Sequence, residues 1–323
     1  MSKRGLIVGI DHYDHVSGLT GCVADAMAME SVLSRNGDGS INYECRILVS
    51  PGPAPIAKAF LRSQWRELFH DFRDDVLFYF SGHGTPTEVG GYLVTQDGTL
   101  DDPGLPMNDV VTMANNSPAR TVLLILDCCF SGSTGNPASL QSGDLEDRAL
   151  LREGVTILAA SRPTQVSMEL GGHGVFTNLV LGALRGGAAD VRGRVSAASI
   201  YAYAEAALGA WQQRPLYKSH AAHLEPVRVC EPKVPDTLLR ELTTYFPCPD
   251  HEYQLDMTYE ETNQGAAIPE RVDTFKKFKQ LQIAGLLRPK VGNDLYWSAE
   301  RSGHVLLTEL GKFYLQLVRQ GRI

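Results

Sequence analysis

Short apolar runs alternate along the first 230 residues with stretches in which apolar positions recur at helical spacing. Runs this rich in Val, Ile, Leu and Phe are typical of strands buried on both faces of a parallel sheet. Strands are predicted at residues 5–10, 45–49, 75–80, 121–126 and 155–160. Helices are predicted at residues 25–33, 56–69, 106–114, 176–184 and 197–208, and a Gly- and Asp-rich loop after residue 80. The alternation favours an α/β domain, with a mainly parallel sheet and helices on both faces.

Two segments interrupt this alternation. Residues 133–154 combine Gly, Pro, Ser, Asn and clustered acids with little apolar periodicity. A loop of that length inside a compact domain is usually functional or disordered. The second segment, residues 231–236, contains two prolines and is interpreted as a linker. The first domain is therefore expected to cover residues 1–230.

Residues 237–323 are expected to form a second, smaller domain. A helix over 272–287, a hairpin of strands 295–297 and 305–307, and a helix over 310–318 resemble a winged-helix-like α+β module. A small α+β bundle with no nucleic-acid role is the alternative. Basic and acidic residues are roughly balanced in this part, which favours a regulatory or docking role over DNA binding.

Composition and charge narrow the class of protein. The chain has 323 residues, of which 43% are hydrophobic and 21% charged, as in soluble globular proteins. A net charge of −7 argues against a nucleic-acid partner. No apolar run approaches the ~20 residues of a membrane helix, and the apolar stretch near the start is too short for a signal peptide. The six cysteines show no CxxC pairing or zinc-ligand spacing, so a cytoplasmic protein is expected.

Two of the predicted strands are followed directly by small residues that flank a reactive side chain. Strand 75–80 is followed by Ser-Gly-His-Gly, which contains His83, and strand 121–126 by Asp-Cys-Cys-Phe-Ser-Gly, which contains Cys129. Ligands bind beyond the carboxyl ends of strands in open α/β sheets. If these strands are parallel neighbours, an imidazole and a thiol lie in one crevice. A thiol nucleophile with an imidazole base nearby is the smallest set of groups that supports nucleophilic acyl transfer. The sequence therefore predicts a cysteine peptidase.

The same motifs resemble the caspase-like cysteine peptidases (clan CD, peptidase C14), most closely the metacaspase and bacterial orthocaspase branch. His83 and Cys129 lie 46 positions apart (129 − 83), near the roughly 50 of caspases. Residues 171–177 resemble the small-subunit segment of that family, whereas the pentapeptide Gln-Ala-Cys-Arg-Gly of the Asp-specific animal enzymes is absent. The resemblance implies a large-subunit-like part (1–132), a linker (133–154) and a small-subunit-like part (155–230).

The resemblance also assigns the catalytic groups. The family's nucleophile is the second residue after the aspartate, which is Cys129, and His83 assists its deprotonation. Backbone N–H groups of Gly84 and Cys129 are expected to hold the oxyanion. Neighbouring side chains alternate along an extended strand end, so Cys128 is expected to be a buried, inert thiol.

Substrate preference is expected to follow from two carboxylates. Asp25 lies in a segment that resembles the one carrying an S1 aspartate in metacaspases, and Asp127 matches the other. Paired carboxylates favour Arg or Lys at P1 over Asp. Ser161, just past a strand end, is a further candidate for this pocket. The alternatives are a helix-dipole role for Asp25 and structural support of the loop by Asp127.

A metal site is not favoured. Some metacaspases bind calcium through aspartates after the catalytic histidine, and Asp97, Asp101, Asp102 and Asp109 match that pattern only in part. A solvated acidic loop is the favoured interpretation, because a calcium site needs several converging oxygens. No cofactor is therefore expected.

The linker 133–154 contains Arg148 and Arg152, which fit the predicted basic P1 preference. Cleavage there, by the chain itself or by an upstream protease, is expected to order the active site. An unprocessed mobile loop is the alternative.

Protein substrates, and an activating protease or regulator acting through the C-terminal domain, are the expected partners. The resemblance implies a stress, cell-death or antiviral defence pathway. Two rival functions stay open: a non-catalytic scaffold with a peptidase fold, and a winged-helix regulator that processes only itself.

Overall fold

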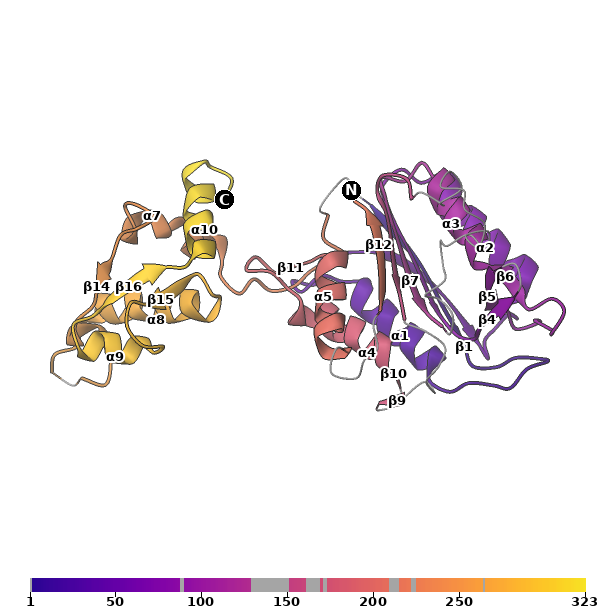
Figure 1. Cartoon of the computed structure of the whole chain (residues 1–323), viewed down its shortest axis with the longest axis horizontal. Coiled ribbons are helices and arrows are strands. Elements are labelled where there is room, and N and C mark those ends of the chain that lie inside the picture. Colours follow the sequence, from indigo (N-terminus) through magenta and orange to yellow (C-terminus); the bar gives the residue numbers. More distant parts are fainter. Residues whose placement is uncertain are drawn as a thin grey trace, which may run out of the picture. The chain divides into compact units, whose positions relative to one another are not determined.

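The computed structural model describes residues 2–87, 90–128, 151–160, 169–170, 173–208, 215–221, 225–263 and 265–323. The chain divides into two compact units, which are Met1–Ala189 with Arg194–Cys230, and Asp190–Gly193 with Glu231–Ile323 (Figure 1). The loop 190–193, which the sequence placed in the first domain, belongs to the second unit. Val191 packs there against Val234, and the Val234 N–H donates to the Val191 carbonyl at 3.2 Å.

A six-stranded sheet forms the centre of the first unit. Its order is β12-β8-β7-β3-β1-β2, and all neighbours are parallel except β12 and β8. The strands are β1 (Lys3–Ile10), β2 (Glu44–Ser50), β3 (Asp75–Ser81), β7 (Thr121–Asp127), β8 (Val155–Ala159) and β12 (Leu216–His220). The mainly parallel sheet expected from the sequence is confirmed. Strand β12 was not predicted, because half of this short edge strand is polar.

Helices cover both faces of this sheet (Figure 1). One face carries α2 (Lys58–His70) and α3 (Met107–Asn116), and the other carries α1 (Cys22–Leu33), α4 (Val175–Gly182) and α5 (Ala197–Leu208). Successive residues of one strand enter opposite cores: Leu124 packs on the α2 side and Ile125 on the α1 side. Burial on both faces explains why the strand sequences are continuously apolar.

The segment after β3 forms a second, three-stranded antiparallel sheet, where the sequence predicted a loop. Its strands are β4 (Gly84–Thr87), β5 (Gly90–Val94) and β6 (Gly104–Pro106). These strands are short and rich in Gly and Pro, so they carry no periodic signal. Backbone pairing joins this sheet to the end of β3, since the Val94 N–H donates to the His83 carbonyl at 3.0 Å.

Short elements complete the first unit. They are β9 (Glu169–Leu170), β10 (His173–Gly174), β11 (Arg194–Val195), β13 (Arg228–Val229) and a π-helical turn, η3 (Ala183–Gly187). This turn directly follows α4, and Gly186 within it has a φ of 114°, which favours glycine.

The second unit contains α6 (Asp236–Arg240), α7 (Leu242–Tyr245), the 3-10 turn η5 (Met257–Tyr259), α8 (Pro269–Ile283), α9 (Leu295–Glu300) and α10 (Glu309–Arg319). Its sheet has the order β14-β16-β15, from β14 (Tyr253–Gln254), β16 (His304–Leu307) and β15 (Leu287–Pro289).

The predicted hairpin in this unit is wrong. Residues 295–297 are helical, and β16 pairs with β14 and β15 instead. The side chain of Asp294 accepts a hydrogen bond from the Tyr296 N–H at 2.9 Å. This N-cap starts helix α9 and outweighs the strand propensity of Tyr296 and Trp297.

None of the helices in the described ranges is long and apolar enough to span a membrane.

Candidate active site

Strands β3 and β7 end side by side at one edge of the sheet. Their register places Ser81 opposite Asp127, and the Gly82 N–H donates to the Asp127 carbonyl at 3.4 Å. His83 follows Ser81 by two positions, and Cys129 follows Asp127 by two. Cys129 itself lies outside the described residues. The two candidate catalytic groups therefore start from the same level of two hydrogen-bonded strands.

Four contacts hold His83. Its N–H donates to the Tyr13 hydroxyl at 2.7 Å, its carbonyl accepts from Val94, and its ring centroid lies 4.8 Å from that of Tyr13. The fourth contact joins Nε2 to the Ser17 carbonyl at 2.9 Å. A carbonyl can only accept, so this bond requires the proton on Nε2. In the neutral imidazole, Nδ1 then carries the lone pair that can accept a proton.

Tyr13 is a site residue for which the sequence carries no signal. It is 5% exposed, and burial raises the pKa of its phenol above the ordinary value, so it stays neutral. A Cβ on Gly82 would lie 2.7 Å from the Tyr13 oxygen, which explains the glycine before His83. Tyr13 thus fixes both the backbone and the ring of His83.

Gly84 is placed beside His83, and both line a pocket of about 240 Å³ that also includes Ser17. Gly84 pairs with Leu93 of β5, while the bond from Val94 to the His83 carbonyl flanks that pair. This is the non-hydrogen-bonded kind of antiparallel pair, so the Gly84 N–H points away from β5.

The two predicted S1 carboxylates converge on the first turn of α4. Asp25 is 2% exposed, and its Oδ2 accepts from the Ser81 hydroxyl at 3.4 Å and the Gly174 N–H at 3.2 Å. Asp127 Oδ2 accepts from the N–H and the Oγ1 of Thr177, at 3.2 and 2.6 Å. A Cβ on Gly174 would lie 2.8 Å from Asp127 Oδ2 and 3.3 Å from Asp25 Oδ2. The carboxylates are therefore neighbours.

Asp25 belongs to the first turn of α1 but reaches away from that helix. The N–H groups of Cys22 and Val23 are bonded by Asp11, at 2.8 and 3.3 Å. Asp11 follows β1 directly, so the end of one strand caps the next helix and orients Asp25 toward α4.

Burial raises the pKa of Asp127 to about 6, and the nearby Asp25 adds to the shift. The two bonds from Thr177 oppose it by stabilising the carboxylate. Burial also raises the pKa of the neighbouring Cys22 thiol to about 12, so this cysteine stays protonated. The site is therefore a partly buried acidic pair that would gain from a cation.

Cys128 points into the opposite core. It is 6% exposed and packs within the cluster under α2 and α3 that also contains Tyr13.

Three of the four acids considered as calcium ligands have protein partners, and the fourth, Asp101, is exposed. Asp97 Oδ1 accepts from the Lys58 N–H at 2.9 Å and the Thr95 hydroxyl at 2.7 Å, so it caps α2. Asp102 pairs with the Lys58 ammonium, and Asp109 with Arg62 at 2.7 Å. Across the described residues, no group of three or more His, Cys, Asp or Glu side chains could hold a metal ion.

Arg152 is bound by main-chain carbonyls. Its guanidinium donates to Ala114, Ala119 and Glu153 at 3.2, 2.6 and 2.6 Å. The other sequence candidates, Arg148 and Ser161, lie outside the described residues.

Comparisons with known proteins bear on the family. A model of the caspase domain, Peptidase C14, matches residues 2–224. No curated protein matches the chain. The crystal structure of protein GSU0716 from Geobacter sulfurreducens is similar in fold, with a TM-score of 0.52 and 17% identity over 72% of this chain and all of that chain. With the family match spanning most of the chain, this protein belongs to the caspase family of cysteine peptidases.

Proposed function

We propose that this protein is a cysteine endopeptidase that uses a dyad of His83 and Cys129 to cleave proteins after Arg or Lys. The observation that carries the proposal is the acidic pair of Asp25 and Asp127, which lies where β3 and β7 end. The family supplies the peptidase chemistry, and the pair supplies the preference for a cation. The metacaspase and orthocaspase branch fits this preference.

The dyad would work as follows. His83 Nδ1 removes the proton of the Cys129 thiol, and the thiolate attacks the scissile carbonyl carbon. The Gly84 and Cys129 N–H groups donate to the oxyanion as the C–S bond forms. The imidazolium then returns its proton to the leaving amine, and the C–N bond breaks. Water, deprotonated by His83, hydrolyses the thioester and releases Cys129.

The acidic pair favours a guanidinium or ammonium for a physical reason. Two carboxylates in one partly buried place repel each other, and a cation between them removes that repulsion. A guanidinium can also bind a carboxylate through two parallel N–H bonds. An aspartate at P1 would add a third negative charge, so the pocket rejects it.

Catalysis is proposed to need no metal, because Asp97, Asp102 and Asp109 bind residues of helix α2. Activation is proposed to follow a cut at Arg148, since the guanidinium of Arg152 is held by three carbonyls.

The C-terminal unit is proposed to dock a regulator or substrate, and the family suggests a cytoplasmic stress or defence pathway.

The deciding experiment measures hydrolysis of fluorogenic peptides that differ only in P1 Arg, Lys or Asp. Wild type is compared with Cys129→Ala and with the matched control Cys128→Ala, with and without a calcium chelator. The proposal expects Arg and Lys cleavage that survives in the control and is lost in Cys129→Ala. Full activity of Cys129→Ala would reject the dyad, and preferential Asp cleavage would reject the pocket assignment. A purified chain that is inactive even after cleavage at Arg148 would instead favour a scaffold.

A further inference from the structure

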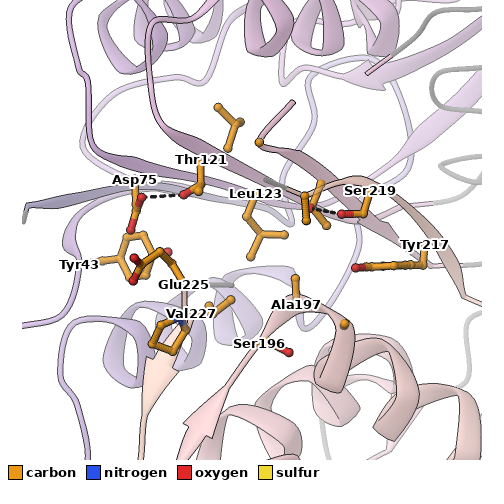
Figure 2. Close-up of a pocket in the computed structure, with 16 residues that line it drawn as sticks. Tyr43, Asp75, Thr121, Leu123, Ser196, Ala197, Tyr217, Ser219, Glu225 and Val227 are labelled. Atoms are coloured by element: carbon orange, nitrogen blue, oxygen red, sulfur yellow. Dashed lines mark hydrogen bonds between the residues drawn. The ribbon is translucent and has the colours of Figure 1, made fainter. Parts of the chain in front are cut away.

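A cavity of about 80 Å³, drawn in Figure 2, lies at the starts of β3 and β7, whereas His83 follows the end of β3. It is lined by Asp75 and Thr121, which are the first residues of β3 and β7 and lie opposite each other in the register. Ser196 and Ala197, at the start of α5, line it as well. The volume far exceeds the roughly 10–15 Å³ that one water needs. None of its lining residues belongs to the candidate active site, so the cavity is separate from that site.

The cavity has two polar ends and an apolar middle. Figure 2 shows Asp75, Tyr43 and Glu225 on one side and Ser219 and Tyr217 on the other. The Ser219 hydroxyl is bonded to that of Thr156 at 2.7 Å, so this end is satisfied by its own side chains. Leu123 and Ala197 lie between these two ends, and Val122, Ala198 and Val227 line the cavity as well.

The charged residues that line the cavity, within the described part of the chain, are both acids. The side chain of Asp75 is 3% exposed, and it is satisfied by Thr121 Oγ1 at 2.7 Å and by Arg120 Nη2 at 3.0 and 3.1 Å. Glu225 receives one longer bond, from Arg120 Nη1 at 3.3 Å. This leaves Glu225 as the less neutralised carboxylate.

The cations near this end are already engaged. Arg120 is held by Asp75 and Glu225, and the Lys3 ammonium donates to the Pro226 carbonyl at 2.7 Å. Lys3 also lies 5.1 Å from the centroid of the Tyr43 ring. Neither cation is among the residues that line the cavity, so the charged groups that line it are the two carboxylates.

Tyr43 provides an independent sign of a ligand. It is 5% exposed and lines the cavity, and its hydroxyl has no hydrogen-bond partner among the described residues. The Tyr43 oxygen is not among the fully enclosed polar atoms without a partner, so it faces space in the cavity that water or a ligand can reach. Burial and the nearby Asp75 raise the pKa of this phenol, so it is neutral and can accept or donate. A bound group with a donor would satisfy it.

We propose that this cavity binds a small primary aliphatic amine as its ammonium ion. The ammonium donates to the Glu225 carboxylate and to the Tyr43 oxygen, and the alkyl chain lies along Leu123 and Val227. An ammonium has three N–H donors and no acceptor, which matches this end, because the Glu225 carboxylate and the Tyr43 oxygen can both accept. The site is distinct from the peptidase site, so its binding does not depend on catalysis.

The test titrates purified full-length protein with n-propylammonium chloride and follows heat by calorimetry and the unfolding temperature by fluorescence. Propan-1-ol and sodium propionate serve as neutral and anionic probes of similar shape, and sodium chloride matches ionic strength. We expect saturable binding and a rise in unfolding temperature with propylammonium alone. Absence of saturation, or equal effects of propanol or propionate, would overturn the proposal.

Two variants assign the site. Glu225→Gln keeps the shape and removes the charge, and we expect it to weaken binding at least tenfold. Tyr43→Phe removes the unpartnered hydroxyl, and we expect several-fold weaker binding with little loss of stability. Glu153→Gln, at an exposed position outside the cavity, is the matched control and should bind as wild type. Unchanged affinity in Glu225→Gln would refute the assignment.

A last arm distinguishes a free amine from a lysine side chain, since both carry an ammonium. Nα-acetyl-lysine methylamide replaces propylammonium in the same titration. The small-amine proposal expects weaker binding of this larger molecule. Binding of the lysine derivative alone would reject a free amine and assign the cavity to a peptide side chain.

Discussion

The Thr177 hydroxyl donates to Asp127 Oδ2 at 2.6 Å and joins the first turn of α4 to the end of β7. The same Oγ1 lies 2.6 Å from the hydroxyl of the buried Tyr79. One threonine therefore links a candidate specificity residue to the core of the sheet.

Thr177→Val should raise the pKa of Asp127 above its value of about 6, because it removes a bond that stabilises the carboxylate. The acidic limb of kcat/KM for a P1-Arg peptide should then move to higher pH. Stability should fall by about 1–3 kcal/mol, since the Tyr79 hydroxyl loses its hydrogen bond to Thr177. Thr177→Ser keeps the hydroxyl and is the control. An acidic limb that stays in place in the valine variant would contradict the prediction.

Asp127→Asn should change how stability depends on pH. The folded-state pKa of about 6 lies above the ordinary 3.8, so the native state binds the extra proton between these values. Stability of the wild type should therefore fall as pH rises from about 4 to 6 and then level off. The variant lacks this slope and should be the more stable form at pH 7.5, by about 1–3 kcal/mol, with the gap closing near pH 4. Urea denaturation across this range measures the difference.

Asp101→Asn, at an exposed position, is the control for the Asp127 variant and should follow the wild-type curve. A wild-type slope that persists in Asp127→Asn would assign the titration to another group. Asp127→Asn should also lose most activity on P1-Arg peptides, through a higher KM.

Tyr13→Phe should lower activity through His83. It leaves the His83 N–H without its acceptor and loosens the loop that positions the ring, while the ring contact survives. We expect a stability loss of about 1–2 kcal/mol and a fall in kcat of tenfold or more. Tyr296→Phe in the second unit is the control. Unaltered kcat in Tyr13→Phe would show that this bond does not position the imidazole.

Asp97→Ala should destabilise the protein without creating or removing a calcium dependence. Asp97 caps α2 through the Lys58 N–H, and loss of such a cap costs about 0.5–2 kcal/mol. Chemical denaturation with and without a chelator measures both effects. A chelator that lowers the stability or activity of the wild type would instead support a metal site.

Arg148→Ala and Arg152→Ala should behave differently. The first should stop cleavage of the linker, with stability unchanged. The second should lower stability by about 1–3 kcal/mol, because it leaves the Ala119 carbonyl without its donor and removes one of the two donors to the Ala114 carbonyl. Gel analysis of processing and denaturation of the intact chain separate the two effects. Processing that stops only in the Arg152 variant would reverse the assignment.

The sequence by itself determined the central sheet except for its edge strand β12, together with the strand ends that carry the chemistry. Strands buried on both faces have continuous apolar runs, and this signal is local, so β3 and β7 were readable from their own residues. The motif around His83 was readable for the same reason. The S1 aspartates entered through a family resemblance rather than through any local pattern.

Only the tertiary structure decided how the site is held together. Asp25 and Gly174 are 149 positions apart, and His83 is 70 positions from Tyr13, so no local pattern reports these bonds. The helix α9, predicted as a strand, shows that one capping aspartate can outweigh aromatic strand propensity. The physical reason is general: burial patterns of single elements are local, whereas partners of polar side chains are set by packing between distant segments.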